Sequence, residues 1–282
     1  MAGYTSFRCG GNAKLLLIPE DGEQLFYVLE KLRRDGEKFM ILGNGSNVLF
    51  ADEGYDGTVV HLGEAFSGIA IDGETVTAGA GALLSRIARA AADASLSGLE
   101  FASGIPGSLG GGIFMNAGAY DGEMKNVLLS VQSIRADGQL IERKASELGL
   151  GYRRSIFMDN GEVILSAKLG LKPGEKSEIE AKIADFTNRR VTKQPLQFPS
   201  AGSFFKRPEG YFAGKLIQDA GLKGLRVGGA MVSPLHAGFL INAGGATATD
   251  VIDLMKVVQE TVMERFGVLL EPEVRIIGKQ TH

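Results

Sequence analysis

Two glycine-rich segments are the parts of this sequence whose residue types best suit ligand binding. They read ILGNGSNVLF at residues 41–50 and SGIPGSLGGGIFMNAG at residues 103–118. Because glycine has no Cβ and tolerates positive φ, such segments let backbone N–H groups approach a pyrophosphate closely. Neither is a P-loop, because no Gly-Lys-Ser/Thr follows. The first is not a dinucleotide-binding turn either, because it lacks the third glycine and lies between two strand-like runs.

Two charged residues, Arg153 and Glu273, are candidates for a chemical role. Arg153 lies in GYRRSIF, where adjacent arginines on an extended segment point to opposite faces, so that one can enter a cleft and bind a carboxylate in a bidentate manner. The alternative is two solvated surface charges. Glu273 lies in LEPEVRII, and a carboxylate in an apolar strand is costly unless it is paired or functional. An ion pair with Arg275 or another arginine explains Glu273 equally well.

Ser203 and His236 are weaker candidates when they are taken alone. Ser203 lies in SAGSFFKRP, which is not a Gly-x-Ser-x-Gly nucleophile elbow, and an isolated serine here is typical of a turn. The histidines at positions 61, 236 and 282 have no metal-ligand spacing, so we expect no metal.

The first 65 residues predict a β-α-β-loop-β unit. Strands are expected at 15–18, 39–42 and 48–50, around the first glycine segment. A helix is expected at 21–35, because Asp21 and Gln24 form a plausible capping box before an apolar stripe.

Residues 66–190 predict a second unit that contains the second glycine segment as a loop. It has two hairpins with Asp-Gly turns, a further strand and two helices. The expected ranges are 69–71 with 75–78 and 127–135 with 139–143 for the hairpins, 163–171 for the strand, and 82–95 and 176–190 for the helices.

Residues 191–268 predict a third unit, entered at Pro195 and Pro199. Helices are expected near 212–220 and at 249–266, and a strand at 238–242. Residues 269–282 are expected to return to the first unit as a strand that runs through VLLEPEVRIIG. Because strands and helices do not alternate regularly, the fold class is α+β.

Composition excludes several classes of protein. The chain has 282 residues, 40 of them glycine, and a net charge of −3 without a basic run, so nucleic acid is not an expected partner. No apolar stretch approaches the length of a membrane span, and the N-terminus lacks a signal peptide. Cys9 is the only cysteine, which leaves no intrachain disulfide. We therefore expect a cytoplasmic monomer without membrane insertion.

Five motifs in the same order resemble one enzyme family, and the resemblance covers residues 5–278. The motifs are ILGNGSNVLF, SGIPGSLGGGIFMNAGAY, GYRRSIF, SAGSFFKRP and LEPEVRIIG. The sequence resembles the UDP-N-acetylenolpyruvoylglucosamine reductase (UDP-N-acetylmuramate dehydrogenase) family. The resemblance implies an FAD-binding fold of the vanillyl-alcohol-oxidase/PCMH type, with two α+β subdomains at 1–65 and 66–190. It also implies an α+β substrate domain at 191–268.

The resemblance gives both glycine segments a role in FAD binding. The first is expected to meet the FAD pyrophosphate and the second to line the cofactor. The implied cofactor-binding residues are Gly43, Asn44, Gly45, Ser46, Asn47, Ser103, Gly104, Ile105, Pro106, Gly107, Gly110, Gly111, Asn116 and Gly118.

The implied chemistry is a two-stage hydride relay. NADPH first reduces the flavin. NADP then leaves, and the enolpyruvyl sugar nucleotide takes the place of NADP and is reduced. By motif position, Arg153 and Glu273 match the groups at the substrate carboxylate, Ser203 matches the proton donor, and Lys193 resembles a lysine that faces the substrate phosphate.

The sequence departs from the better-known form of the family. The better-known form has an inserted loop that carries a tyrosine, between the middle strand and the crossing into the third unit. This sequence is too short between 163 and 190 for that loop, and so it resembles the shorter, second-type variant. Arg207 replaces an asparagine and His236 a glutamine among the implied substrate-binding residues, and Arg207 could neutralise phosphate in place of the missing tyrosine. Two alternatives stay open: another FAD enzyme of the same fold, and a flavin-free sugar-nucleotide-binding protein.

Overall fold

The structure is a computed structural model that describes residues 1–278, and the chain divides into two compact units. Unit 1 combines Met1–Lys14, Gly45–Asp56 and the chain from Val191 onward. Unit 2 combines Leu15–Asn44 and Gly57–Arg190. Residues 1–65, expected as one subdomain, therefore contribute to both units. The last four residues of the expected segment 269–282 lie outside the described residues.

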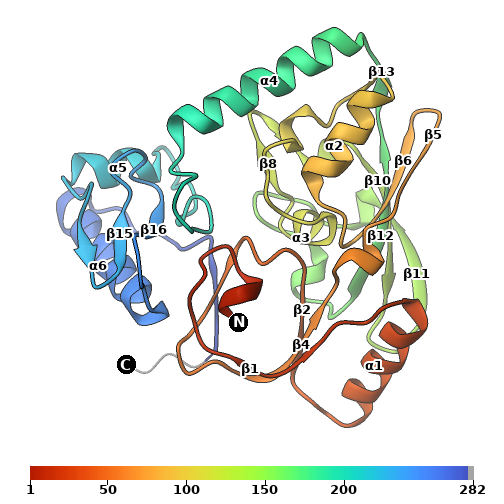
Figure 1. Ribbon diagram of the computed structural model, residues 1–282, viewed down its shortest axis with the longest axis horizontal. Helices are drawn as coiled ribbons and strands as arrows, with labels where there is room; N and C mark the ends of the chain where they lie inside the picture. Colours follow the sequence, from red (N-terminus) through yellow and green to blue (C-terminus); the bar gives the residue numbers. More distant parts are fainter. Residues whose placement is uncertain (279–282) are drawn as a thin grey trace. The chain divides into compact units, whose positions relative to one another are not determined.

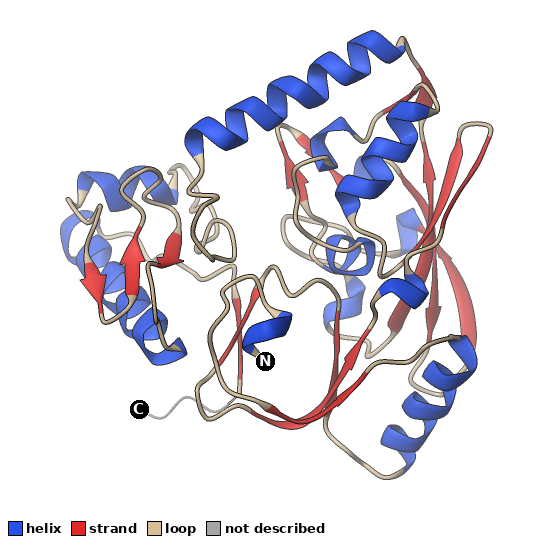
Figure 2. Ribbon diagram, viewed as in Figure 1, coloured by secondary structure: helices blue, strands red, loops and turns tan. Residues whose placement is uncertain are grey.

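Unit 2 is built around a five-stranded antiparallel sheet with the strand order β11-β10-β12-β6-β5 (Figures 1 and 2). Its strands are β5 (Ile69–Asp72), β6 (Thr75–Gly79), β10 (Leu128–Ile134), β11 (Leu140–Lys144) and β12 (Val163–Gly170). Both expected hairpins are confirmed: β5 pairs with β6 and β10 with β11. Gly73 and Gly138 have positive φ in the two turns, as Asp-Gly turns require.

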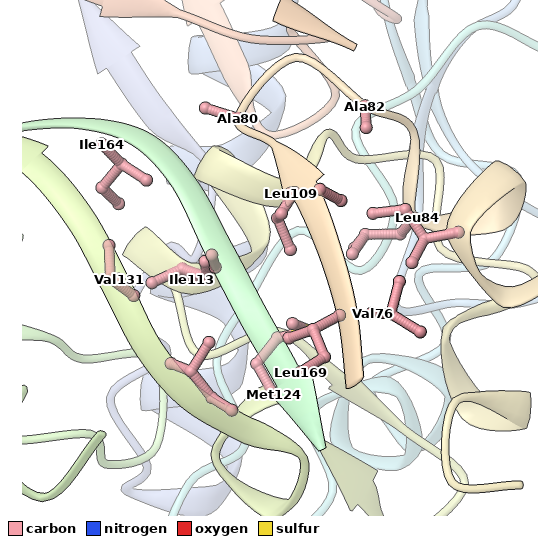
Figure 3. Close-up of a cluster of buried hydrophobic side chains, with 14 of the residues drawn as sticks. Val76, Ala80, Ala82, Leu84, Leu109, Ile113, Met124, Val131, Ile164 and Leu169 are labelled. Atoms are coloured by element: carbon pink, nitrogen blue, oxygen red, sulfur yellow. The ribbon is translucent and has the colours of Figure 1, made fainter. Parts of the chain in front are cut away.

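One face of this sheet is covered by helices α2 (Leu84–Asp93) and α3 (Leu109–Phe114), which lie on the same side of it in Figure 1. The apolar side chains between these layers form the largest core cluster of the unit. Figure 3 shows part of this cluster, with Val76, Val131 and Leu169 from three strands beside Leu109 and Ile113 of α3. Burial of these side chains holds the second glycine segment, which includes α3, against the sheet.

A three-stranded sheet with the order β1-β4-β2 carries the first glycine segment at the end of one strand. Its strands are β1 (Ala13–Leu17), β2 (Phe39–Leu42) and β4 (Tyr55–His61), and helix α1 (Gly22–Arg34) connects β1 to β2. The expected cap of α1 is half confirmed. Asp21 accepts from the Gln24 N–H, whereas the Gln24 side chain accepts from Glu20 instead of the cap residue. Strand β4 was not expected, because Asp56-Gly57 has the composition of a turn.

The smaller elements complete unit 2. They are two-residue pairs, a long helix and single turns of 3₁₀ helix. The pairs are β7 (Leu96–Ser97) with β13 (Lys172–Pro173) and β8 (Gly118–Ala119) with β9 (Gly122–Glu123), and the long helix is α4 (Lys176–Lys193). The chain's 3₁₀ turns are Ala2–Tyr4, Glu64–Phe66, Glu100–Ala102, Met124–Asn126, Ala145–Glu147 and Ile156–Met158.

Unit 1 packs two helices on a small antiparallel sheet. The sheet has the order β14-β15-β16, and a separate parallel pair joins β17 to β3. The bounds are β3 (Val48–Phe50), α5 (Ala213–Asp219), β14 (Arg226–Val227), β15 (Ala230–Val232), β16 (Leu240–Asn242), α6 (Ala248–Phe266) and β17 (Arg275–Ile277). The apolar side chains along one face of α6 are buried except for that of its last residue, Phe266, which is exposed. The alternation of strands and helices is irregular, and the α+β class is confirmed.

The structure corrects two expectations. The strand expected through residues 268–278 is restricted to β17, because Pro272 has no N–H for a ladder and forms only an isolated bridge with Phe205. The second glycine segment is not a loop throughout, because α3 runs through three of its glycines. Glycine disfavours helix, but here it allows close packing: a Cβ on Gly110 would lie 3.1 Å from Ala80 Cβ, and one on Gly112 would lie 3.0 Å from Leu84.

Asp52 ties the chain beside the first glycine segment to the start of α6 within unit 1. Its carboxylate accepts hydrogen bonds from the backbone N–H groups of Ala248 and Thr249, at 2.9 and 2.8 Å, and from the Thr249 hydroxyl. The capping residue Thr247 accepts from Asp250 N–H, so all three of these first N–H groups of the helix are satisfied. Burial opposes ionisation of Asp52, but these hydrogen bonds outweigh it and lower the pKa of the carboxyl.

We expect Asp52→Ala to reduce the free energy of unfolding at neutral pH by about 1–2 kcal/mol, as the loss of a helix cap does. Because the folded-state pKa is lowered, this contribution is present above the unfolded-state pKa of 3.8 and is lost as the pH falls below it. Urea unfolding from pH 7 to pH 3 should therefore show a difference from wild type that shrinks only at the acid end. Asp56→Asn is the matched control, and an equal loss in that variant would contradict the assignment.

Candidate functional site

The first glycine segment presents a run of backbone donors to its surroundings. The N–H groups of Asn44, Gly45, Ser46 and Asn47 donate to no acceptor within residues 1–278. Gly45 has φ 61°, and a Cβ on it would lie 1.9 Å from the carbonyl oxygen of Tyr4, so only glycine fits. Successive N–H groups without internal partners form the kind of nest that binds an anion.

Side-chain amides hold both ends of this segment in place. In unit 2, the Asn44 amide donates to the carbonyl of Pro106 and so joins the two glycine segments. In unit 1, the Asn47 amide donates to the carbonyl of Glu273 at 3.1 Å. The two asparagines therefore support the segment with their side chains, and their backbone N–H groups remain available to a ligand.

The second glycine segment packs directly against the first within unit 2. A Cβ on Gly43 would lie 2.0 Å from the hydroxyl oxygen of Ser108. Ser108 is only 3% exposed, and its hydroxyl has no hydrogen bond within the described chain. The N–H groups of Gly104, Gly107 and Gly111 also lack acceptors there. Sequence analysis missed Ser108, although its position just before α3 is that of a capping residue.

Other residues of the second segment serve the protein's own packing. The Ser103 hydroxyl donates to the carbonyl of Glu100 at 2.8 Å. A Cβ on Gly118 would lie 2.6 Å from the carbonyl oxygen of Gly122 in the β8–β9 pair. Ile105 is half-buried and Pro106 is exposed, and both stand in the turn before α3. These contacts explain the residue types without reference to a ligand.

The Asn116 side chain is enclosed by the protein and makes hydrogen bonds within unit 2. It is fully buried, and its amide donates to Glu123 at 2.8 Å and to the carbonyl of Gly151 at 3.0 Å. Its side-chain oxygen accepts from the Lys125 N–H at 2.9 Å. The expectation that Asn116 lines the cofactor stays a prediction, which the burial of this side chain and its three protein partners do not favour.

Arg190 is a second residue that sequence analysis missed. Its side chain is half-buried over the second glycine segment, where a Cβ on Gly104 would lie 3.2 Å from a guanidinium nitrogen. Burial lowers its pKa, and it has no hydrogen bond or ion pair within residues 1–278. The neighbouring Arg189 instead pairs with Asp185 at 2.7 Å. The sequence does not distinguish Arg189 from Arg190, because the difference in their burial arises from packing between distant segments.

Arg153 lies in a tight turn and not on an extended segment. Gly151 and Arg154 exchange backbone hydrogen bonds at 3.1 and 3.2 Å, and Arg153 has φ 53° between them. Its guanidinium carbon lies 4.9 Å from the ring centre of Tyr152. Arg153 is half-buried and Arg154 exposed, so the expected difference between the two arginines exists, but the turn produces it and not strand alternation.

Ser203 and Glu273 lie on neighbouring backbone segments of unit 1. The Glu273 N–H donates to the carbonyl of Phe204 at 2.8 Å, and Lys206 N–H donates to Glu271 in the same arrangement. Ser203 is exposed, the two phenylalanines that follow it are buried, and Glu273 is half-buried. The structure thus joins these two candidates through their backbone, whereas Arg153 belongs to unit 2.

The three expected substrate-binding residues, Lys193, Arg207 and His236, also lie in unit 1. Lys193 is exposed at the end of α4. The Arg207 guanidinium lies 4.0 Å from the ring centre of the exposed Phe212, a cation–π arrangement.

His236 is held as a neutral donor. Gly238 N–H donates to its Nδ1 at 3.1 Å, which leaves Nε2 to carry the proton. Burial, followed by the nearby charge of Lys223, lowers the pKa of the imidazole. The side chain therefore offers an N–H that stays uncharged near neutral pH.

No group of three or more His, Cys, Asp or Glu side chains suited to a metal occurs among residues 1–278. Over the same residues, no helix is both long and apolar enough to cross a membrane.

Comparisons with known proteins agree on one family. A family model described as an FAD binding domain matches residues 13–143. A second, described as the C-terminal domain of UDP-N-acetylenolpyruvoylglucosamine reductase, matches residues 194–277. These two matches confirm the FAD-binding fold with an additional C-terminal domain, as the motifs predicted.

Relatives that match nearly the whole chain are named as reductases of the same kind. The chain is 52% identical to a UDP-N-acetylenolpyruvoylglucosamine reductase of Clostridium perfringens, over 99% of this chain and 91% of that protein. It is 50% identical to one of Alkaliphilus oremlandii, with 99% and 92% covered. The crystal structure of the reductase from Thermus caldophilus superimposes with a TM-score of 0.85 at 37% identity, covering 98% of this chain and 97% of that one.

The contact between the two glycine segments can be tested by a double-variant cycle. We expect Gly43→Ala to reduce both FAD retention and stability, by about 1–3 kcal/mol for an overpacked site, because its Cβ meets Ser108 Oγ. Ser108→Ala alone removes a buried hydroxyl without a partner and should not lower the melting temperature. The double variant should recover most of the loss. Flavin absorbance after gel filtration and the melting temperature measure both effects, and a double variant no better than Gly43→Ala would refute the contact.

Proposed function

Because the chain belongs to the UDP-N-acetylenolpyruvoylglucosamine reductase family, we propose that it reduces UDP-N-acetylenolpyruvoylglucosamine to UDP-N-acetylmuramate with NADPH. This reaction is a step in the synthesis of a peptidoglycan precursor. The observation that best supports it is the run of N–H groups from Asn44 to Asn47 that have no acceptor among residues 1–278, in a chain with a matching FAD binding domain. A monomer in the cytoplasm is part of the same proposal.

When bound, FAD would supply the hydride chemistry that links NADPH to the enolpyruvyl double bond. The residues proposed to hold its pyrophosphate are those of the first segment, through their N–H groups and the Ser46 hydroxyl. The turn from Ser103 to Gly107, with Gly110 and Gly111, is proposed to line the rest through backbone groups. The half-buried Arg190 beside Gly104 adds a positive charge there. Binding by amides needs no lysine, which agrees with the absence of a P-loop.

Arg153 is proposed to bind the substrate carboxylate. When hydride adds to the terminal vinyl carbon, negative charge grows toward that carboxylate. A guanidinium fixed beforehand stabilises this charge more than mobile water does, and such a donor is typically worth about 3–4 kcal/mol in kcat. Glu273 is proposed to orient the cation or to share a proton at the same group.

Ser203 is proposed to protonate the carbon next to the carboxylate. A serine hydroxyl is a weak acid in water, so it requires surroundings that polarise it or a water relay. The buried pair Phe204–Phe205 gives its segment a dry support, and the hydrogen bond from Glu273 N–H to Phe204 fixes the backbone beside it. Together, hydride and proton complete the reduction of the double bond.

Lys193, Arg207 and His236 are proposed to contact the diphosphate of the sugar nucleotide. The neutral His236 can donate through Nε2 without a change of charge. Arg207 remains ionised at any working pH and is oriented by the Phe212 ring. Its charge is proposed to take over the role of the tyrosine-bearing loop that this chain lacks.

The proton-donor role predicts a separation of the two half-reactions. Ser203→Ala should be reduced by NADPH at the wild-type rate, because no proton transfer from Ser203 occurs in that step. Its anaerobic reoxidation by the enolpyruvyl sugar nucleotide should slow by about 10²–10⁴-fold, the usual contribution of a general acid.

Stopped-flow absorbance of the flavin measures both steps, and Ser200→Ala is a control from the same segment. Equal damage to both half-reactions would count against the proton donor. A wild-type protein that NADPH does not bleach, or that simple enol ethers reoxidise equally well, would overturn the proposed function itself.

The phosphate role of Arg207 predicts an effect on binding. Arg207→Ala should raise the KM for the sugar nucleotide about tenfold, equivalent to roughly 1.4 kcal/mol, and should leave the KM for NADPH and kcat nearly unchanged. Lys206→Ala is the matched control, because Lys206 already pairs with Glu271 at 3.0 Å. An unchanged KM in Arg207→Ala would dismiss this role.

A further inference from the structure

The turn that contains Arg153 is strained, and this strain has to be compensated. Arg153 is the third residue of the turn from Gly151 to Arg154, with φ 53°. That position normally takes glycine or asparagine, and a side chain with a Cβ raises the energy of this conformation. An isolated surface turn with this sequence would relax to other conformations. Something in unit 2 must therefore keep it as it is.

Two buried side-chain hydrogen bonds hold the turn, one on each side of Arg153. On the preceding side, the Asn116 amide donates to the carbonyl of Gly151 at 3.0 Å. On the following side, the Ser155 hydroxyl donates to the carbonyl of Phe114 at 2.7 Å. Both side chains are essentially buried, with 0% and 1% of their surface exposed. Both attach the turn to the same place, the C-terminal end of α3.

Asn116 is itself fixed and cannot adjust if the turn moves. Its second amide hydrogen is donated to Glu123 at 2.8 Å, and its oxygen accepts from Lys125 N–H at 2.9 Å. It also has φ 42°, a conformation that asparagine tolerates better than most residues. The amide group is thus saturated and its orientation is determined by all three partners.

We propose that Asn116 and Ser155 are positioning residues that hold Arg153 in its strained turn at the end of the second glycine segment. The inference rests on the proposed role of Arg153 at the substrate carboxylate. Neither residue touches substrate or cofactor, because both are buried. They act by fixing the backbone on either side of Arg153, so that the guanidinium is in place before negative charge develops. The assignment also explains why an asparagine stands where a cofactor contact was expected.

Positioning differs from simple stabilisation in which step it affects. Because Arg153 is proposed to act on the substrate carboxylate, loss of either hydrogen bond should leave the reduction of the flavin by NADPH unchanged. We expect Ser155→Ala to slow reoxidation by the enolpyruvyl sugar nucleotide about tenfold, because small misplacements of a catalytic group reduce rates by up to about 10²-fold. FAD content should stay at the wild-type level.

The control is another buried serine of unit 2 with the same chemistry. Ser133 is 0% exposed and donates to Glu162 at 2.8 Å, far along the chain from the turn. Ser133→Ala should lower stability to a similar extent and should not separate the half-reactions. Slowing of reoxidation in Ser133→Ala as well would assign the effect to stability alone and overturn the proposal.

A double-variant cycle tests whether the effect passes through Arg153. In an Arg153→Lys background, Ser155→Ala should slow reoxidation less than twofold further, because the guanidinium that it positions is gone. A full tenfold additional loss would overturn the proposal. If wild-type protein is not reoxidised by the enolpyruvyl compound at all, the proposed function fails instead. Hydrogen exchange then still tests whether the two hydrogen bonds hold the turn. Amides of residues 151–156 should exchange at least tenfold faster in Ser155→Ala than in Ser133→Ala, and equal exchange would refute the proposal.

Discussion

The site depends on one constraint: backbone N–H groups must be held rigidly and yet be left without acceptors from the protein. Ordinary secondary structure cannot do this, because it fixes a backbone by satisfying its N–H groups. Here the glycine segments are fixed by contact instead. Gly43 packs on Ser108 and Gly45 on the carbonyl of Tyr4, each closer than a Cβ allows, and Gly110 packs on Ala80 more tightly than most Cβ atoms do. Glycine is required at these positions because the packing replaces the hydrogen bonds.

The same scaffold supports two parts of the candidate site in unit 2. Helix α3 begins in the second glycine segment, and its other end receives the hydrogen bonds of Asn116 and Ser155. The helix has only six residues, and the core against β6 and β12 holds it in place. A change in that packing would therefore alter both the backbone donors and the turn of Arg153. This shared support is a reason for the large buried cluster beneath such a short helix.

Sequence patterns predicted the elements whose signal is local. The Asp-Gly hairpins, the Asp21 cap and the long helix α6 each follow from residues within a few positions of one another. The errors arose where distant contacts decide. Helix α3 forms through three glycines because Ala80 and Leu84 accept their close approach, and the turn at Arg153 exists because buried groups from α3 hold it. The motifs identified an FAD-binding family, and the segments expected to bind the cofactor stay a prediction. Only burial and hydrogen bonds distinguish Asn116, Ser108 and Arg190 from their neighbours.

The candidate residues are divided between the units: unit 1 positions Ser203 and Glu273, and unit 2 positions Arg153. The backbone segments that contain Ser203 and Glu273 are joined by the hydrogen bond from Glu273 N–H to the Phe204 carbonyl, and the Asn47 amide of the first glycine segment donates to the carbonyl of Glu273. Arg153 is held by α3 in unit 2. Each group is therefore held by contacts within its own unit. Preorganisation of this kind means that little rearrangement is needed when charge develops on a substrate, which is the condition under which fixed dipoles and charges accelerate a reaction.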